Sequence, residues 1–225
     1  MARRKLEGRS ALITGAGRGV GAALAKKIAK DGAKVIVADL DRHPAEDTVS
    51  SIREAGGEAA VFCGNVMDSD FGERAIDFML HTFGGVDIIV NNAGYIWNSS
   101  IGKTSDEQWQ AMLDCHATAP FRILRAATAF IRSSAAKEKQ EGTAFNRKVV
   151  NVSSIAGFYG GATQIGYSAA KAAQIGITKT LAKEWAKYRV NVNCVGFGFI
   201  ETRLTQAWSG DEPARIEVGN KTHAV

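Results

Sequence analysis

Short apolar runs alternate with amphipathic segments along most of the chain. Runs rich in Val, Ile and Ala predict strands near residues 10–14, 33–39, 58–63, 86–91, 148–153 and 189–195. Helical periodicity predicts helices near residues 20–30, 44–55, 70–83, 105–134 and 163–187. Strands that alternate with helices are typical of a mostly parallel sheet covered on both faces. We therefore predict a doubly wound α/β fold in three layers, α/β/α.

Two segments fall outside this alternation. Residues 137–147 are charged and contain a glycine, which predicts an exposed loop. The tail from Ser209 to Val225 is polar and lacks a strong period, so no regular element is predicted there. No linker or internal repeat divides the chain, and we expect one domain over residues 1–225.

The composition fits a globular protein, with 45% hydrophobic and 23% charged residues among 225. No apolar run approaches the roughly 20 residues that span a bilayer. The basic first residues are followed by Glu7 and Gly8, where a signal peptide would have its apolar segment. These features predict a cytoplasmic protein without a membrane partner.

Three cysteines and four histidines are scattered along the chain without a ligand spacing, so no metal site is expected. The formal net charge of +5 fits either a basic solvated surface or attraction of anionic ligands such as a nucleotide. The basic residues form no recognisable module with aromatic residues, and we expect no nucleic-acid partner.

A glycine-rich segment, Thr14–Gly21 (TGAGRGVG), follows the first predicted strand. Glycine allows a tight turn and a close backbone approach, which suits a pyrophosphate at the N-terminus of the next helix. Asp39 ends the second strand, where a carboxylate can bind ribose hydroxyls and repel a 2′-phosphate, and this favours NAD over NADP. Arg18 is the opposing signal, because a guanidinium could pair with that phosphate.

Tyr167 and Lys171 are four residues apart on the long predicted helix, so both side chains lie on one face. A free tyrosine has a pKa near 10, and a nearby ammonium group favours the phenolate and lowers that pKa. Tyr167 could then exchange a proton with an alcohol or a carbonyl. Ser154 ends the fifth strand, where its hydroxyl could stabilise charge on the substrate oxygen, although Ser153 or Ser154 could instead cap a helix or turn.

Together these residues resemble the short-chain dehydrogenase/reductase family, and most closely its members that are similar to 3-oxoacyl-carrier-protein reductases. The resemblance covers about Leu6 to Thr205. It is carried by TGAGRGVG, Asp39, NNAG at Asn91–Gly94, Ser154, YSAAK at Tyr167–Lys171, and GFIET at Gly198–Thr202. It implies a Rossmann fold and an NAD(P)-dependent oxidoreductase that moves hydride between a nicotinamide and a carbonyl or hydroxyl group.

The resemblance also implies roles for single residues. Tyr167 would be the acid/base, with Ser154 and Lys171 as its catalytic partners. The residues implied to contact the cofactor are Gly15, Gly19 and Val20 at the pyrophosphate, Asn65 and Val66 at the adenine, Asn92, Ala93, Gly94 and Ile200 near the nicotinamide, and Lys171 at its ribose.

Three positions depart from the family pattern. His116 stands where the family usually has a catalytic Asn that holds a relay water. It could replace that Asn and titrate near neutral pH, or it could be a packing residue. Phe197 replaces the usual proline after the sixth strand, and Asn65 stands where Asp is usual. The family also continues with a helix and a last strand, so we predict a sheet without that strand and a shortened substrate-loop region at 206–225.

Several alternatives stay open from the sequence. The expected substrate is a 3-oxoacyl thioester or a related ketone or secondary alcohol, with sugars and steroids as competitors. A protein that binds a dinucleotide without catalysis, as a sensor or partner subunit, is the other class. The first half of the long helix is apolar on most sides, which predicts a second subunit and hence a homodimer or homotetramer.

Overall fold

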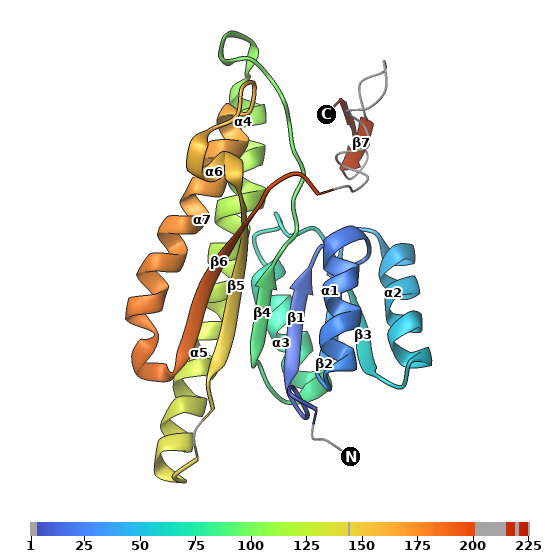
Figure 1. Cartoon of the computed structure of the whole chain (residues 1–225), viewed down its shortest axis with the longest axis vertical. Coiled ribbons are helices and arrows are strands. Elements are labelled where there is room, and N and C mark those ends of the chain that lie inside the picture. Colours follow the sequence, from blue (N-terminus) through green and yellow to red (C-terminus); the bar gives the residue numbers. More distant parts are fainter. Residues whose placement is uncertain (1–3, 144, 201–214, 219–220, 225) are drawn as a thin grey trace.

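The centre of the molecule is a six-stranded parallel sheet with the order β3-β2-β1-β4-β5-β6 (Figure 1). The computed structural model describes residues 4–143, 145–200, 215–218 and 221–224. The six strands are β1 (Ser10–Thr14), β2 (Lys34–Asp39), β3 (Glu58–Cys63), β4 (Ile88–Asn91), β5 (Arg147–Ser154) and β6 (Val190–Phe197). The predicted doubly wound α/β fold is therefore confirmed, since this strand order is that of a dinucleotide-binding sheet.

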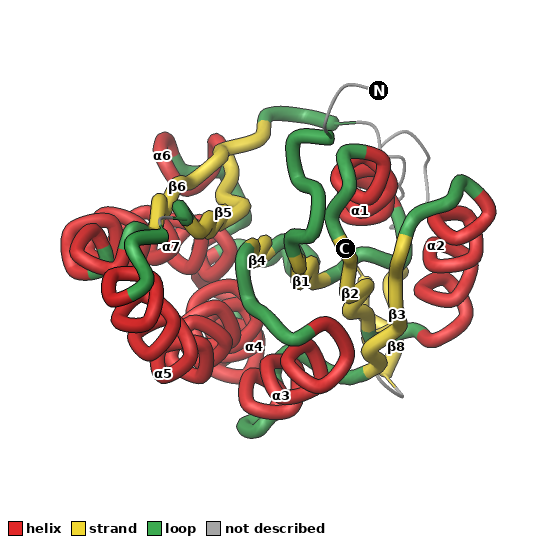
Figure 2. Tube along the Cα trace, turned by 90° about the horizontal axis from the view of Figure 1, so that it is seen from below, coloured by secondary structure: helices red, strands yellow, loops and turns green. Residues whose placement is uncertain are grey.

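Helices cover both faces of the sheet (Figure 2). The helices on one face are α1 (Gly19–Lys30) and α2 (Arg42–Glu54), and those on the other are α3 (Phe71–Phe83), α5 (Ala119–Gln140) and α7 (Ile165–Glu184). Successive strand residues point to opposite faces. Accordingly, Ile13 and Val37 pack toward α1 and α2, whereas Leu12 and Ile36 pack toward α3 and α5. This double burial explains why the strands read as continuous apolar runs.

The helix expected at residues 105–134 consists of three segments. It begins as α4 (Asp106–Leu113), whose first turn is closed by a capping box between Ser105 and Gln108. A π-helical turn, η2 (Asp114–Thr118), then leads into α5. Such turns redirect side chains and often occur at functional sites. Here the turn carries Cys115 and His116, both of which are buried.

The loop predicted at residues 137–147 is wrong in its first part, because α5 continues to Gln140. The charged residues there lie on a helix whose end is held by an ion pair. Arg147 at the start of β5 reaches Glu138 at 2.6 Å, with its side chain 5% exposed. A charged composition therefore does not indicate a loop here, and the connection between α5 and β5 is confined to residues 141–146.

Short elements complete the described chain. They are η1 (Ile101–Lys103), α6 (Ile155–Tyr159), η3 (Ala186–Tyr188), β7 (Arg215–Val218) and β8 (Lys221–Ala224). The tail was expected to be irregular, but β7 and β8 pair as an antiparallel two-stranded sheet. Residues 201–214 lie outside the described residues, and with them part of the predicted substrate-loop region. Among the described strands, none pairs with the outer edge of β6.

The carboxyl ends of the six parallel strands share one edge of the sheet. The strand order reverses between β1 and β4, and this switch point is where open α/β sheets bind ligands. Within the described residues, no helix is long and apolar enough to cross a membrane. The same part of the chain brings no three His, Cys, Asp or Glu side chains together as a metal site would require.

Candidate active site

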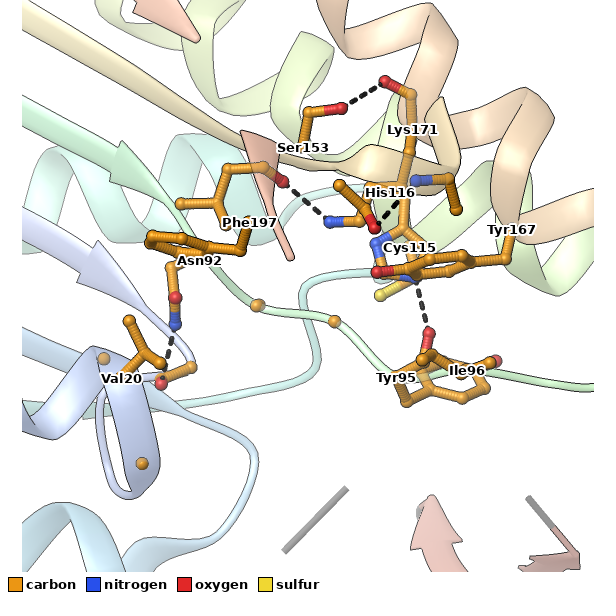
Figure 3. A pocket seen from close by; sticks show the side chains of 18 of the residues that line it. Val20, Asn92, Tyr95, Ile96, Cys115, His116, Ser153, Tyr167, Lys171 and Phe197 are labelled. Carbon is orange, nitrogen blue, oxygen red and sulfur yellow. Dashed lines mark hydrogen bonds between the residues drawn. The ribbon is translucent and has the colours of Figure 1, made fainter. Parts of the chain in front are cut away.

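A cavity of about 710 Å³ opens at the carboxyl edge of the sheet. Its size is within the range of small-molecule and cofactor sites. Its walls come from the loops after β1, β2, β3, β4, β5 and β6 and from the first turns of α7 (Figure 3). It brings together every site residue expected from the sequence, namely Gly15, Arg18, Gly19, Val20, Asp39, Asn65, Val66, Asn92, Ala93, Gly94, His116, Ser154, Tyr167, Lys171 and Ile200.

The glycine turn after β1 has no room for side chains. Gly15 has φ +62° and Gly19 has φ +52°, a region that side chains rarely adopt. A Cβ on Gly15 would lie 2.8 Å from the Cα of Ala93, and one on Gly21 would lie 2.0 Å from the carbonyl oxygen of Gly15. The bare backbone and the free N–H groups at the start of α1 fit the pyrophosphate of a dinucleotide.

The side chain of Asn92, the residue after β4, stabilises this glycine turn by hydrogen bonds. Its amide nitrogen donates to the carbonyl oxygens of Thr14 at 2.9 Å and Gly15 at 3.0 Å. In return, the Thr14 hydroxyl accepts the backbone N–H groups of Asn92 at 3.1 Å and Ala93 at 3.0 Å. The role of Thr14 was missed from the sequence, although it begins the glycine motif. Asn92 thus supports the cradle through the protein backbone.

Asp39, the last residue of β2, lines the same cavity as Tyr167. One carboxylate oxygen accepts the N–H of Gly17 at 2.7 Å and the other accepts the N–H of Asp41 at 3.1 Å. Arg18, which the sequence offered as a phosphate ligand, instead forms an ion pair with Asp41 at 2.6 Å. The positive charge in this loop is therefore already partnered by a carboxylate.

The two serines at the end of β5 separate into different roles. The buried Ser153 donates its hydroxyl to the carbonyl oxygen of Lys171 at 2.8 Å, which ties β5 to α7. Ser154 lines the cavity, caps α6 by accepting the N–H of Ala156 at 3.2 Å, and hydrogen-bonds with Tyr167. Both serines line the cavity, but the Ser153 hydroxyl is engaged by the Lys171 carbonyl, so Ser154 is the serine that is placed to reach a substrate oxygen.

Tyr167 and Lys171 lie near each other in the wall of the cavity (Figure 3). The Lys171 ammonium is 5.6 Å from the centre of the Tyr167 ring, and it donates to the carbonyl oxygen of Val152 at 2.7 Å. Burial lowers the pKa of Lys171 to about 8. Its charge is thus held in place by β5 rather than by a carboxylate.

The expected lowering of the Tyr167 pKa is not found in the protein alone. Burial raises this pKa, and the hydrogen bond with Ser154 opposes the rise only in part. The physical reason is that removing a phenolate from water is costly, and this cost outweighs the effect of the nearby groups. Tyr167 by itself is therefore a proton donor at neutral pH.

His116 is fully buried beside this pair. Its Nε2 lies 2.7 Å from the carbonyl oxygen of Tyr95, and because a carbonyl only accepts, Nε2 carries the proton. The ring meets Tyr167 edge-on, with centroids 5.2 Å apart and an interplanar angle of 88°. Burial keeps the His116 pKa well below its ordinary value, and the nearby charge of Lys171 is a second, smaller cause of this lowering. The expected titration near neutral pH is therefore wrong.

Further residues of this region gave no clear signal in the sequence. Tyr95, Met112 and Cys115 form a small apolar cluster that packs against Tyr167. A buried chain of polar groups links β4, β5 and α7, from Asn91 to Asn151 at 2.8 Å and from Asn151 to Thr178 at 2.9 Å. These contacts fix α7 against the sheet, and only the fold shows which residues are partners.

The position of Lys171 leads to a test of its burial. Its pKa is about 8 in the folded protein and about 10.4 in an unfolded chain. Between these values the unfolded chain holds a proton that the folded protein has released, so stability rises with pH. The contribution reaches at most about 3 kcal/mol. Denaturant titrations of the wild type and of Lys171→Met give the free energy of unfolding of each protein. We expect the wild-type value to rise relative to that of the variant as the pH increases from 8 to 10.5. Parallel curves for the two proteins would contradict the burial of a charged amine.

Comparisons with known proteins agree with this geometry. The family model described as short chain dehydrogenase matches residues 9–213. The chain is 36% identical over 207 residues to a 3-oxoacyl-[acyl-carrier-protein] reductase of Vibrio cholerae, covering 92% of this chain and 80% of the relative. The Escherichia coli reductase of the same name is 36% identical over 210 residues, covering 93% and 81%. The crystal structure of a short chain dehydrogenase from Mycobacterium avium superposes with a TM-score of 0.80 at 35% identity, covering 86% of this chain and 68% of that one.

Proposed function

The chain belongs to the short chain dehydrogenase family, and on this premise we propose that it reduces the keto group of a 3-oxoacyl thioester or a related ketone. It is an NAD(P)-dependent oxidoreductase that acts on carbonyl and hydroxyl groups. One observation carries the proposed site. Tyr167, Lys171 and Ser154 line the same cavity as a glycine turn that only a bare backbone fits.

We propose the following division of roles. The bound nicotinamide supplies or accepts the hydride. Ser154 holds the substrate oxygen, and Tyr167 donates its phenolic proton to that oxygen as the carbonyl becomes an alcohol. Lys171 stabilises the resulting phenolate by its charge and positions the ribose. In the oxidative direction, the phenolate of Tyr167 takes the hydroxyl proton.

The contacts of Asp39 favour NAD as the cofactor in this proposal. Its carboxylate is held at the end of β2 by two backbone N–H groups, from Gly17 and Asp41. A 2′-phosphate there would meet the carboxylates of Asp39 and Asp41, and Arg18 is already paired with Asp41. Ribose hydroxyls, in contrast, could donate to Asp39.

Asp39→Ala should weaken NAD binding about tenfold and raise the ratio of NADP to NAD affinity by a similar factor or more. The substitution removes both the hydroxyl acceptor and the repulsion toward a phosphate. Titration of each cofactor by fluorescence or calorimetry measures the two constants. Asp47→Ala removes the same charge from an exposed position of α2 and should change neither constant. An unchanged ratio in Asp39→Ala would show that Asp39 is not the selector.

The proposed function is tested by following NADH and NADPH oxidation with 3-oxoacyl thioesters, simple ketones, sugars and steroids. Turnover of a 3-oxoacyl thioester is the expected result. Binding of cofactor with no turnover of any substrate would instead support a non-catalytic dinucleotide-binding protein. The relatives, which are named as reductases, do not favour that alternative.

We also infer a cytoplasmic homodimer or homotetramer. The support is the outer side of α7, where Ala172 and Gly176 are exposed in the single chain although the helix is apolar around much of its surface. Light scattering after size-exclusion chromatography measures this state directly.

A further inference from the structure

Thr48 places a buried hydroxyl against the glycine turn from α2, a helix that contributes none of the described lining of the cavity. The residue is 3% exposed. Its Oγ1 donates to the carbonyl oxygen of Gly17 at 3.1 Å, a contact between positions 31 apart in the sequence. Thr48 therefore contacts the turn without lining the cavity, and it belongs to neither the cofactor-binding nor the catalytic residues described above.

A second side chain holds the other peptide group of Gly17. One carboxylate oxygen of Asp39 accepts the Gly17 N–H at 2.7 Å. A Cβ on Gly17 would lie 2.9 Å from the same oxygen and 3.1 Å from the backbone nitrogen of Ala45 in α2. The two peptide groups that flank Gly17 are thus each fixed by a side chain, and the residue is packed closely against β2 and α2.

The bond to Thr48 also fixes the direction of the next N–H group, that of Arg18. Within the described residues no peptide bond is cis, and in a planar trans peptide the C=O and the following N–H point in opposite directions. Because the Gly17 carbonyl points to Thr48, the Arg18 N–H points away from α2. Arg18 lines the cavity, and its N–H has no acceptor in the part of the chain that the structure describes.

We propose that Thr48 is a positioning residue for the cofactor, which holds the Gly17 carbonyl so that the Arg18 N–H donates to an oxygen of the cofactor's adenosine diphosphate half. This inference rests on the proposed cofactor site. The Arg18 guanidinium has no part in it, because that group is paired with Asp41. Without the Thr48 hydroxyl, the peptide between Gly17 and Arg18 is free to turn, and the donor is no longer held in place.

The test measures binding of ADP to the full chain by calorimetry. Thr48→Val keeps the branched shape of the side chain and removes the hydroxyl. We expect the Kd for ADP to rise about tenfold, roughly the value of one hydrogen bond. The KM for the cofactor should rise by a similar factor, while kcat at saturating cofactor stays within about twofold. Thr48→Ser returns the hydroxyl and should restore the wild-type Kd.

Thr178→Val is the matched control. Thr178 is also a buried helical threonine, and its hydroxyl accepts the side-chain N–H of Asn151 at 2.9 Å on α7. The control removes the same group from the core at a place where it does not contact the glycine turn. It should lower the free energy of unfolding as Thr48→Val does, and it should leave the Kd for ADP unchanged.

A measurement on the wild type covers the case in which Thr48→Val folds poorly. Addition of ADP should move the amide proton resonance of Arg18 downfield in nuclear magnetic resonance spectra, as a new hydrogen bond does. An Arg18 resonance that does not move overturns the inference. So does an unchanged Kd in Thr48→Val, or an equal loss of ADP affinity in Thr178→Val. A wild-type protein that binds neither ADP nor NAD would instead contradict the proposed cofactor site.

Discussion

Tyr167→Phe should lower kcat for carbonyl reduction about a thousandfold, while cofactor affinity changes by less than about twofold. The variant removes one oxygen atom, which is the proposed proton donor. The aromatic ring remains, and with it the edge-on contact with the His116 ring and the packing against Tyr95, Met112 and Cys115. The loss should therefore fall on the chemical step and leave the fold and the glycine cradle intact.

Steady-state kinetics with saturating cofactor measures this loss, and a cofactor titration measures the binding. Tyr188→Phe, in the short helix η3 outside the cavity, makes the same chemical change and should leave kcat within about twofold. Substantial turnover by Tyr167→Phe would remove Tyr167 from the acid/base role. A parallel loss of cofactor binding would show that the hydroxyl serves the cofactor site instead.

Gly21→Ala should weaken cofactor binding about a hundredfold and lower the free energy of unfolding by about 3 kcal/mol. The added methyl group would lie 2.0 Å from the carbonyl oxygen of Gly15 and 2.7 Å from the side-chain nitrogen of Asn92. These two groups are hydrogen-bonded to each other at 3.0 Å. The contacted atoms are backbone or are bonded to it, so α1 must move away from the turn that it helps to form.

Chemical denaturation and cofactor titration measure the two effects of Gly21→Ala. Gly102→Ala is its matched control, because Gly102 lies in the helical turn η1, outside the cavity, and has no atom within 4 Å of a new Cβ. There the substitution should stabilise the protein by about 0.5–1 kcal/mol, since alanine loses less backbone entropy in a helix than glycine. If both variants change cofactor binding and stability alike, the close packing of α1 against the glycine turn is not required for either property.

The fold was predictable because its signals are local. The apolar runs of β1 and β2 and the glycines between β1 and α1 act within a few residues, and each element formed close to its predicted place. The exceptions have a common cause. The end of α5 is charged like a loop, but the ion pair between Glu138 and Arg147 joins it to β5, and no local pattern contains that contact.

The sequence also predicted which segments line the cavity, since Ser154, Tyr167 and Lys171 end or follow β5, the glycine turn follows β1, and the carboxyl ends of parallel strands meet at one edge of the sheet. What the sequence could not decide is how these groups are surrounded. Ser153 and Ser154 are alike in the sequence and both line the cavity, yet the Ser153 hydroxyl is bound to the backbone of α7 whereas the Ser154 hydroxyl caps α6. The direction of each strand residue, set by the pleat and the neighbouring helices, makes this difference.

By itself, the sequence determined the order of the elements, the glycine cradle and the spacing of Tyr167 and Lys171, because each depends on neighbours along the chain. Only the tertiary structure decided the electrostatic state of the site. Burial raises the pKa of Tyr167 and lowers those of His116 and Lys171. The fold also brings Asn92 against Thr14, 78 positions away in the sequence. The physical reason is that desolvation and hydrogen bonding depend on distances in space, which chain separation does not record.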